Sequence, residues 1–497
     1  MIINKKKSLM GFLQCFICVL LAYGVYLYPH YSQDVYSKMV RLGDFEAISL
    51  QWAIESGRYT YAIINRIVLL TLNTPIINSF TSNLICLFEM TVVIYFFYYL
   101  ISGKKDLPDS FFNYDMALFI SSVCIFINPL FCDWFQFPEC VYIYIIGIIL
   151  VEFSIWELFI KQQLIYALLF FLLAIGCYQP CIGYFVMLSI IMSLKHSVNC
   201  ENNIIKVNFI MLFKNAIKAV GIYGIGCFSQ VIITSFSQKP TRADYDILNN
   251  LHTVINAQRG LWTLSNITNE SYIYIITMLL MILVVVSDLI DRKKKVSLVF
   301  VPLLLVLFLI NYASNFVMAI VAEPWISQRT ITGFLGMASF FLIMYIEIIY
   351  SFNMSVMSKG AIYIITFLTV YYIYLSNFVA INLIKTNTVD LYIARCVQNE
   401  IEKYEVETNQ TVSKIAFLHD KYITYSYPDI VASYDLNVRS WAYDWSIKGM
   451  LYVISGRVYE VVEPSEDLVE LYEGYNWDYF NSEQIIIERD TANIVLY

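Results

Sequence analysis

Residues 5–58 read KKKSLMGFLQCFICVLLAYGVYLYPHYSQDVYSKMVRLGDFEAISLQWAIESGR: a basic start, then a hydrophobic stretch, then an acidic segment. The hydrophobic stretch, residues 11–29, is close to the ~20 residues that an α-helix needs to cross a bilayer. Because Lys5, Lys6 and Lys7 precede it, the positive-inside rule places the N-terminus in the cytoplasm. The acidic segment, residues 31–58, is therefore expected on the opposite side of the membrane.

The amino-acid composition identifies the whole chain as a membrane protein. Of its 497 residues, 59% are hydrophobic and only 14% are charged, and the mean hydropathy is +0.62. Soluble domains average about 25% charged residues. The first apolar stretch is longer than a signal-peptide core and no small-residue cleavage site follows it, so we expect it to stay as an anchor. We predict an α-helical polytopic membrane protein.

Hydropathy predicts about eleven transmembrane helices. Their predicted ranges are residues 11–29, 77–101, 116–131, 141–160, 164–178, 181–194, 219–236, 272–290, 298–317, 331–350 and 361–384. The apolar segment 59–75 is interpreted as interfacial or re-entrant, because a crossing there would invert every later loop. In this topology the inner segments carry 15 Lys and Arg residues and the outer loops before the tail carry 8, as the positive-inside rule requires. The odd number of crossings places the C-terminal tail outside.

The tail differs from the rest of the chain in charge. Residues 386–497 contain 19 acids and 8 bases, a net charge of −11, whereas residues 1–385 carry a net charge of +4. We therefore predict a transmembrane body, residues 1–385, with its first outer loop at 30–76, and a soluble tail, residues 386–497. The acidic charge of the tail argues against nucleic acid as a partner.

The apolar pattern of the tail predicts a small α/β domain. Helices are expected at 389–404 and 438–455, a buried strand at 414–418, and a terminal hairpin from 484–488 and 493–497.

Three carboxylates in the first outer loop are candidate catalytic groups: Asp34, Asp44 and Glu46. A carboxylate at the membrane surface can take the proton of an acceptor hydroxyl. The alternative interpretation is a set of solvated interfacial acids. The same loop offers the oxygen ligands that a divalent cation prefers, so the sequence leaves metal dependence open. No Cys/His cluster with metal-ligand spacing is present.

Arginines near these acids are candidate ligands for a phosphate group. Arg41, Arg58 and Arg329, the last with Gln328 beside it, could hold phosphate oxygens, which a guanidinium binds in a bidentate manner. Arg58 follows Gly57 at a predicted helix break. The alternative is that these arginines only support the structure or reach toward the membrane interface.

Other polar residues near predicted helix ends are candidates for binding an acceptor sugar. Asp133 and Glu139 bracket the sequence WFQFP, and aromatic rings beside acids suit a sugar, although an aromatic belt at the interface is an equal alternative. Trp441 and Trp445 lie four residues apart, on one face of a predicted helix, where packing is the competing interpretation. Two further features are Gln179-Pro180, a turn between two spans, and Glu152, an acid inside a span.

Several motifs in this order resemble one known family: QDVYSKMVRLGDF, WAIESGRYTYAIIN, NPLFCDWFQFPE, GCYQP, QRTITG and a small tail that ends in a hairpin. The chain resembles the phage-borne serotype-converting glucosyltransferases that modify O-antigen, over nearly its whole length. One departure is that relatives often carry paired acids where this chain has Gln33-Asp34.

The resemblance implies a C-type glycosyltransferase fold in the inner membrane of a Gram-negative bacterium, with the tail in the periplasm and a catalytic acid in the first outer loop. It implies the transfer of glucose from undecaprenyl-phosphate-glucose to an O-antigen sugar of lipopolysaccharide. It also implies two functional partners, a small flippase and a polyprenyl-phosphate glucosyltransferase.

Two other functions stay as alternatives. A lipid-linked sugar flippase or transporter has no need of a folded outer tail, and an O-antigen polymerase joins whole repeat units instead of single sugars.

Overall fold

The computed structural model describes most of the helical body and most of the tail. The described residues are 2–39, 53–72, 79–103, 114–201, 204–235, 246–262, 295–296, 306, 309–310, 313, 328–330, 356–418, 426–430, 436–472, 475 and 480–496. Three predicted site residues, Arg41, Asp44 and Glu46, lie outside them, as do the predicted spans 272–290 and 331–350 and nearly all of 298–317.

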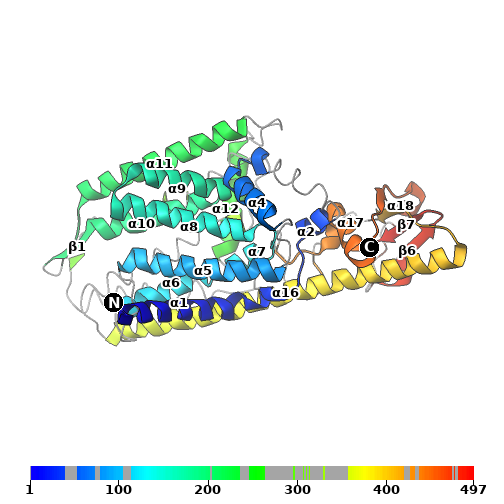
Figure 1. Ribbon diagram of the computed structural model, residues 1–497, viewed down its shortest axis with the longest axis horizontal. Helices are drawn as coiled ribbons and strands as arrows, with labels where there is room; N and C mark the ends of the chain where they lie inside the picture. The colour runs from blue at the N-terminus through cyan, green and yellow to red at the C-terminus, as the bar shows by residue number, and fades with distance from the viewer. Residues whose placement is uncertain are drawn as a thin grey trace.

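Long apolar helices that run alongside one another form the body (Figure 1). They are α1 (Ile2–Tyr23), α5 (Ser79–Ser102), α6 (Tyr114–Phe126), α8 (Val141–Ile155), α9 (Leu164–Cys177), α10 (Cys181–Ser197) and α11 (Phe209–Ser235). Shorter elements join them: η1 (Gly24–Leu27), α2 (Gln33–Met39), α4 (Tyr59–Leu72), η2 (Pro129–Phe131), α7 (Cys132–Phe135), η3 (Trp156–Lys161), α12 (Ile247–Trp262) and η5 (Gln328–Thr330).

The body has the helices of a polytopic membrane protein. Within the described residues, six helical stretches are long and apolar enough to cross a bilayer: Leu9–Leu27, Ser79–Ser102, Asp115–Phe135, Val141–Lys161, Phe209–Ile233 and Ile362–Thr408. Helices α9 and α10 are apolar but shorter, and they pack beside α8. The total of eleven stays a prediction because several predicted spans lie outside the described residues.

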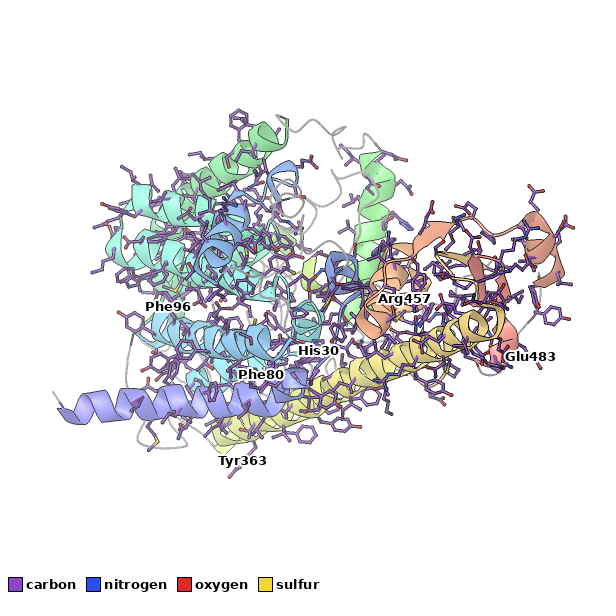
Figure 2. The ribbon with its side chains drawn as sticks, turned by 45° about the vertical axis from the view of Figure 1, so that its right-hand side comes forward. His30, Phe80, Phe96, Tyr363, Arg457 and Glu483 are labelled. Atoms are coloured by element: carbon purple, nitrogen blue, oxygen red, sulfur yellow. The ribbon has the colours of Figure 1, made fainter. Side chains whose placement is uncertain are left out.

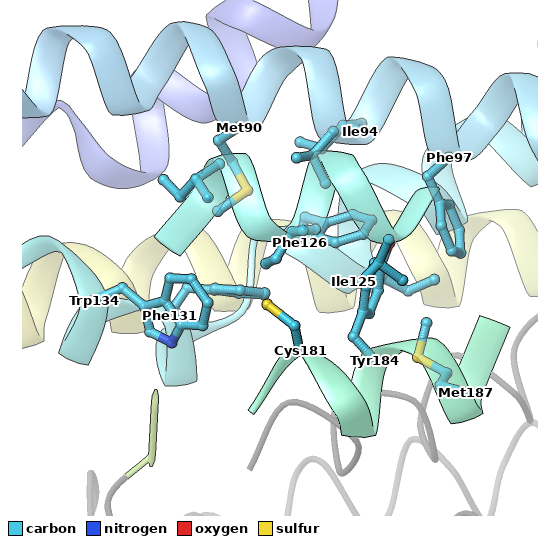
Figure 3. Packing of buried hydrophobic residues seen from close by; sticks show 14 of the residues in the cluster. Met90, Ile94, Phe97, Ile125, Phe126, Phe131, Trp134, Cys181, Tyr184 and Met187 are labelled. Atoms are coloured by element: carbon cyan, nitrogen blue, oxygen red, sulfur yellow. The ribbon is translucent and has the colours of Figure 1, made fainter. Parts of the chain in front are cut away.

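Large side chains fill the centre of the helical body. Phe126 of α6 meets Phe97 of α5 at 5.2 Å and Tyr184 of α10 at 6.0 Å between ring centroids, both edge to face (Figure 3). Edge-to-face packing of this kind is favourable for aromatic rings. The contact joins the consecutive helices α5 and α6 to α10, which comes more than fifty residues later, so the core fixes their relative positions.

A small sheet lies at the end of the body where the N-terminus is found (Figure 1). Strand β1 (Val198–Glu201) pairs antiparallel with β2 (Ile204–Val207), and β3 (Lys295–Val296) pairs parallel with β2. Three segments that the charge pattern assigned to one side of the membrane therefore share one end of the body. The soluble tail lies at the opposite end, which is called the tail end below.

Helix α16 (Val356–Thr408) joins the body to the tail as one continuous element of 53 residues (Figure 1). At 1.5 Å per residue it is about 80 Å long, far more than a bilayer requires. The sequence predicted a span at 361–384 and a separate helix at 389–404, and this separation is wrong. No Gly or Pro interrupts residues 361–408, and the polar side chains between the two parts bond back to the helix: Thr386 to the Asn382 carbonyl and Thr388 to the Ile384 carbonyl.

The tail forms a four-stranded sheet with helices around it. The strand order is β5-β4-β7-β6, with β5 (Glu460–Val462) and β7 (Thr491–Val495) both parallel to β4 (Lys414–Leu418) and β6 (Ile485–Glu488) antiparallel to β7. The predicted strand 414–418 is confirmed; its unbroken apolar sequence suits a strand covered on both faces. The remaining elements are η6 (Ser440–Ala442), α17 (Asp444–Ser455), α18 (Glu466–Tyr472) and η7 (Ser482–Gln484).

Two predicted boundaries in the tail are wrong. The expected helix 438–455 is split, because Tyr443 is extended (φ −131°, ψ 114°) between η6 and α17. The terminal hairpin turns on Arg489 and Asp490, so β7 begins at Thr491 and not at residue 493. Arg489 has a positive φ of 56°, which permits this tight turn.

The tail docks on the segment that follows the first span. Helix α2 packs against α17, and a Cβ atom on Gly449 would lie 1.7 Å from the Tyr36 carbonyl oxygen, so only glycine fits there. Gln33 donates from Nε2 to the Val438 carbonyl at 2.8 Å, and the Tyr31 amide donates to Oδ1 of Asn387 at 2.6 Å. His30 lies at this junction (Figure 2).

Candidate functional site

The candidate site is built around the segment between α6 and α8, at the tail end of the body. Asn128 caps the first turn by accepting a hydrogen bond from the Leu130 amide at 3.0 Å, and Pro129 occupies the first helical position. Helix α7 then presents Asp133 and Trp134, which are 0% and 1% exposed. A buried loop in this place needs partners for its polar groups.

Asp133 finds its charged partner in Arg329, nearly two hundred residues later in the chain. Its Oδ2 accepts from the Arg329 amide at 2.9 Å, and its Oδ1 accepts from Nη1 at 3.0 Å. The guanidinium also lies 4.3 Å from the centre of the Phe137 ring. Asp133 is thus the anchor of Arg329, a task different from the acceptor binding predicted for it.

Arg58 is the second arginine of the site. Its Nη1 donates to the Tyr144 hydroxyl at 2.7 Å and its Nε to Oε1 of Gln179 at 3.2 Å. The guanidinium lies 5.2 Å from the ring centre of Tyr178 and 5.6 Å from that of Tyr144, two rings that stack 4.0 Å apart. Cation–π attraction and two hydrogen bonds therefore hold one half-buried positive charge.

Local sequence explains where Arg58 points. Gly57 has φ +73°, its amide donates to the Ile54 carbonyl at 2.9 Å, and the Arg58 amide donates to the Ala53 carbonyl at 2.7 Å. This pair of bonds is the Schellman arrangement that ends a helix on a glycine. Gln179 completes the support, since its side-chain amide donates to the Ser56 carbonyl.

The two arginines belong to one cluster. The Trp134 ring meets Tyr178 at 5.6 Å and Tyr144 at 6.0 Å, both edge to face. Tyr178 and Tyr144 contact the Arg58 guanidinium, and Trp134 directly follows Asp133, the partner of Arg329. A region with two fixed guanidinium groups and aromatic walls can hold an anionic phosphate beside an apolar surface.

Glu139 adds a carboxylate on the side of the first outer loop. It is 3% exposed, and the Ser32 hydroxyl lies 3.3 Å from each of its oxygens. Ser32 also accepts from the Val35 amide at 3.0 Å and so caps α2. The Tyr61 hydroxyl lies 3.5 Å from the Glu139 carbonyl oxygen, and the Tyr61 ring lies 6.2 Å from the ring of Tyr144, the partner of Arg58. Glu139 therefore belongs to the same cluster.

His30 connects the end of the first span to α7. Its Nδ1 lies 2.8 Å from the Tyr28 carbonyl oxygen and its Nε2 lies 3.1 Å from the Phe135 carbonyl oxygen. Burial lowers the pKa of the His30 imidazole. The ring lies between these two carbonyl groups and so links the end of the first span to α7.

The remaining predicted residues have different surroundings. Asp34 is exposed in the first turn of α2, two residues after Ser32. Gln328 lies in η5 next to Arg329, and its side chain is outside what the structure describes. The predicted shared helix face of Trp441 and Trp445 is wrong, because Trp441 lies in η6 and Trp445 in α17.

The two tryptophans also differ in exposure. Trp441 is fully buried in the core of the tail and donates from Nε1 to the Asp390 carbonyl at 3.1 Å. Trp445 is 55% exposed and stacks on Tyr443 at 4.4 Å.

Sequence reasoning did not assign a role to several residues of the cluster: Gln136, Tyr144, Tyr178 and Gln179. Tyr144 and Tyr178 lie within apolar runs that read as ordinary span ends, and Gln179 was interpreted as a turn. Tyr178 and Gln179 could have been identified by their places beside Cys177 and Pro180 at a span end, whereas Tyr144 and Gln136 have only apolar neighbours in the sequence. Glu152, in α8, accepts from the Tyr184 hydroxyl at 2.8 Å inside the bundle and belongs to its packing. Among the described residues no group of three His, Cys, Asp or Glu side chains is arranged to hold a metal ion.

These features define a polytopic membrane protein with a half-buried site of two arginines, carboxylates and aromatic rings at the end of the body where the tail lies. The family model described as Glucosyl transferase GtrII matches residues 43–340, more than half of the chain. The chain therefore belongs to the GtrII glucosyl transferase family, which confirms the resemblance found in its motifs. The matched range contains Arg58, Asp133, Glu139 and Arg329. No curated protein matches the chain at a significant level.

Proposed function

We propose that the protein transfers one glucosyl unit from undecaprenyl-phosphate-glucose to an O-antigen sugar on the periplasmic face of the inner membrane. The observation that carries the proposal is the pair of fixed guanidinium groups, Arg58 and Arg329, at the tail end of the body. A lipid phosphate at the bilayer surface needs positive charge there, while its lipid chain needs the apolar helices beside it.

The chemistry requires few groups. The bond between glucosyl C1 and the phosphate oxygen breaks, and a bond forms between C1 and the acceptor hydroxyl oxygen. The phosphate leaves with the bonding electron pair, and Arg58 and Arg329 stabilise its charge. The hydroxyl proton passes to a carboxylate, for which Asp34, Asp44 and Glu46 are the candidates.

The tail supplies the acceptor side in this proposal. Trp445 and Tyr443 present a stacked aromatic surface, and Trp445 is more than half exposed. Because Trp441 is buried and Asp133 is engaged by Arg329, we assign acceptor contact to Trp445. Glu139 lies nearer the first outer loop, where the acceptor and donor would meet.

The membership in a glucosyl transferase family favours this function over a flippase or a polymerase. A small flippase and a polyprenyl-phosphate glucosyltransferase would supply the donor on the correct face. In this proposal the two arginines stabilise the charge of the leaving phosphate without a metal ion. The acidic loop could also hold a divalent cation, and removal of metal ions by a chelator tests this.

The test is an O-antigen analysis with and without the gene, combined with an assay of the purified protein in proteoliposomes. We expect the O-antigen repeat to gain one hexose, and radiolabelled glucose to pass from polyprenyl-phosphate-glucose to the acceptor. A repeat unit of unchanged mass together with no transfer in proteoliposomes would refute the proposal. Changed chain length with an unchanged repeat would favour the polymerase instead.

A further inference from the structure

A chain of buried hydrogen bonds leads from the tail to Arg329. The Asn437 amide donates to Oε1 of Gln136 at 3.2 Å, and Nε2 of Gln136 lies 3.4 Å from Oδ1 of Asp133. That same carboxylate oxygen accepts from Nη1 of Arg329 at 3.0 Å. Gln136 is 1% exposed and Asn437 is fully buried, so water does not replace these bonds.

The orientation of the Gln136 amide follows from its two partners. A backbone N–H can only donate and an ionised carboxylate can only accept, so the oxygen must face Asn437 and the nitrogen must face Asp133. Among side chains of this length that are neutral near pH 7, glutamine is the one that offers an amide oxygen as acceptor and an amide N–H as donor. Gln136 is therefore suited to link the two groups.

Asn437 is itself held firmly by α16. Its φ is +58°, in the left-handed region that Asn tolerates better than most residues. Its side-chain amide donates to the Val379 carbonyl at 3.2 Å, and its carbonyl accepts from the Thr386 hydroxyl at 3.3 Å. The position of the tail relative to α16 therefore sets the position of the Asn437 amide.

We infer that Gln136 is a positioning residue that makes the tail a structural part of the donor phosphate site. It orients the Asp133 carboxylate, which in turn orients the Arg329 guanidinium toward the phosphate. The inference rests on the proposed function, because it assigns Arg329 to the donor. It also gives the tail a second role besides contact with the acceptor: the tail holds Asp133 and Arg329 of the donor site in their orientation.

The test compares Gln136→Met and Gln136→Glu with a matched control, Gln398→Glu. Gln398 is a buried glutamine of α16 that bonds in the same way: its Oε1 accepts from the Tyr459 hydroxyl at 2.9 Å and its Nε2 donates to Oε1 of Glu402 at 2.9 Å. The control thus introduces the same change beside a carboxylate, away from Arg329. Michaelis constants for polyprenyl-phosphate-glucose and for the acceptor are measured on purified, folded protein.

Gln136→Met should raise the donor KM by about tenfold or more, the worth of one hydrogen bond to a charged group, and leave the acceptor KM unchanged. A role limited to stability would instead lower the amount of active protein without moving the donor KM. Gln398→Glu should leave both constants near those of the natural protein.

Gln136→Glu gives a readout that a merely structural role would not produce. The new carboxyl would take the place of an amide that bonds to Asp133 and to the Asn437 backbone N–H, and Arg329 bonds to the same Asp133 oxygen. Beside the Asp133 carboxylate the new group repels when ionised, but when protonated it can donate as the amide does. The donor KM of this variant should therefore fall toward the natural value as the pH is lowered from about 8 to about 6, relative to the natural protein.

Two results separate the failure of this inference from the failure of the proposed function. If Arg329→Ala raises the donor KM and the two Gln136 variants do not, the positioning role is refuted and the donor site stands. If Arg329→Ala also leaves the donor KM unchanged, Arg329 is not a donor residue and the positioning role of Gln136 fails with it. The proposed function fails only if the natural protein shows no transfer from polyprenyl-phosphate-glucose at all.

Discussion

At the scale of single residues, the site depends on how two arginines are held. Arg329 is fixed by a buried carboxylate, whereas Arg58 is fixed by a phenol, an amide and two aromatic faces. A carboxylate partner offsets part of the positive charge, but neutral partners leave it in full. We therefore expect Arg58 to stabilise the phosphate charge more strongly, and Arg329 to fix the position of the phosphate more exactly.

The first prediction concerns Arg329. Arg329→Ala should reduce glucosyl transfer by roughly 10- to 150-fold, the equivalent of about 1.5–3 kcal/mol for a hydrogen bond to a charged group. The matched control is Arg457→Ala, which removes another arginine paired with a carboxylate, Glu405 at 2.7 Å, on the surface of the tail. Exposed pairs of this kind contribute little. Equal losses in the two variants would exclude Arg329 from the site.

The second prediction concerns the catalytic acid. Asp34→Asn should lower transfer by more than ~10²-fold if Asp34 is the general base, because Asn keeps the shape but cannot take a proton. The protein should remain folded, since Asp34 is exposed. Asp44→Asn, Glu46→Gln and Glu139→Gln are assayed alongside it. Should Asp34→Asn stay active while one of the others fails, the role passes to that residue.

At the scale of elements, the contact between α2 and α17 decides where the tail sits. These two short helices approach so closely that Gly449 meets the Tyr36 carbonyl, and Gln33 on α2 also bonds to the chain just before η6. Asp34 is the neighbour of Gln33 on α2, and Asn437 is the neighbour of Val438, whose carbonyl accepts the hydrogen bond from Gln33. The docking of α2 on α17 thus brings the candidate base Asp34 and the tail residue Asn437, which bonds to the donor site, to the same region.

The third prediction tests this contact. Gly449→Ala should destabilise the docked tail by about 1–3 kcal/mol or more, because the added methyl group has no space beside the Tyr36 carbonyl. Limited proteolysis and thermal unfolding in detergent measure the effect. Gly221→Ala in α11 is the control, since a Cβ there meets nothing within 4 Å. Equal stability of the two variants would show that α2 and α17 are not packed in this way.

At the scale of the whole molecule, one long helix links the helical body to the tail. Helix α16 passes alongside α1 and α6 in the body and then contributes Ile393, Val397 and Ile401 to the core of the tail. A continuous helix transmits position better than a flexible linker does. The tail is therefore expected to keep a fixed place over the site.

The fourth prediction is topological. A reporter that is active only in the periplasm should be active when fused after Tyr497 and silent when fused after Lys295. The reason is the excess of Lys and Arg in the inner segments, together with the placement of β1 and β3 at the end opposite the tail (Figure 1). An inactive fusion after Tyr497 would mean that the number of crossings is even, most simply because α4 spans the bilayer.

The sequence by itself determined the membrane class, the apolar helices of the described body, the strand at 414–418 and the family. These features are local or compositional: a run of apolar residues spans a bilayer whatever its neighbours are, and a motif is read along the chain. Helix ends in the tail were less well predicted. Tyr443 is extended and divides one predicted helix, and residues 385–388 are helical and join two predicted helices into one.

Only the tertiary structure decided which polar residues meet. Asp133 contacts Arg329 across 196 residues and Gln136 contacts Asn437 across 301, and no local pattern encodes either pair. Burial likewise separated Trp441 from Trp445, which the sequence treated alike. The physical reason is that a buried polar group must find its partner wherever the packed helices place one. In this protein the partners of α7 come from a late loop of the body and from the tail.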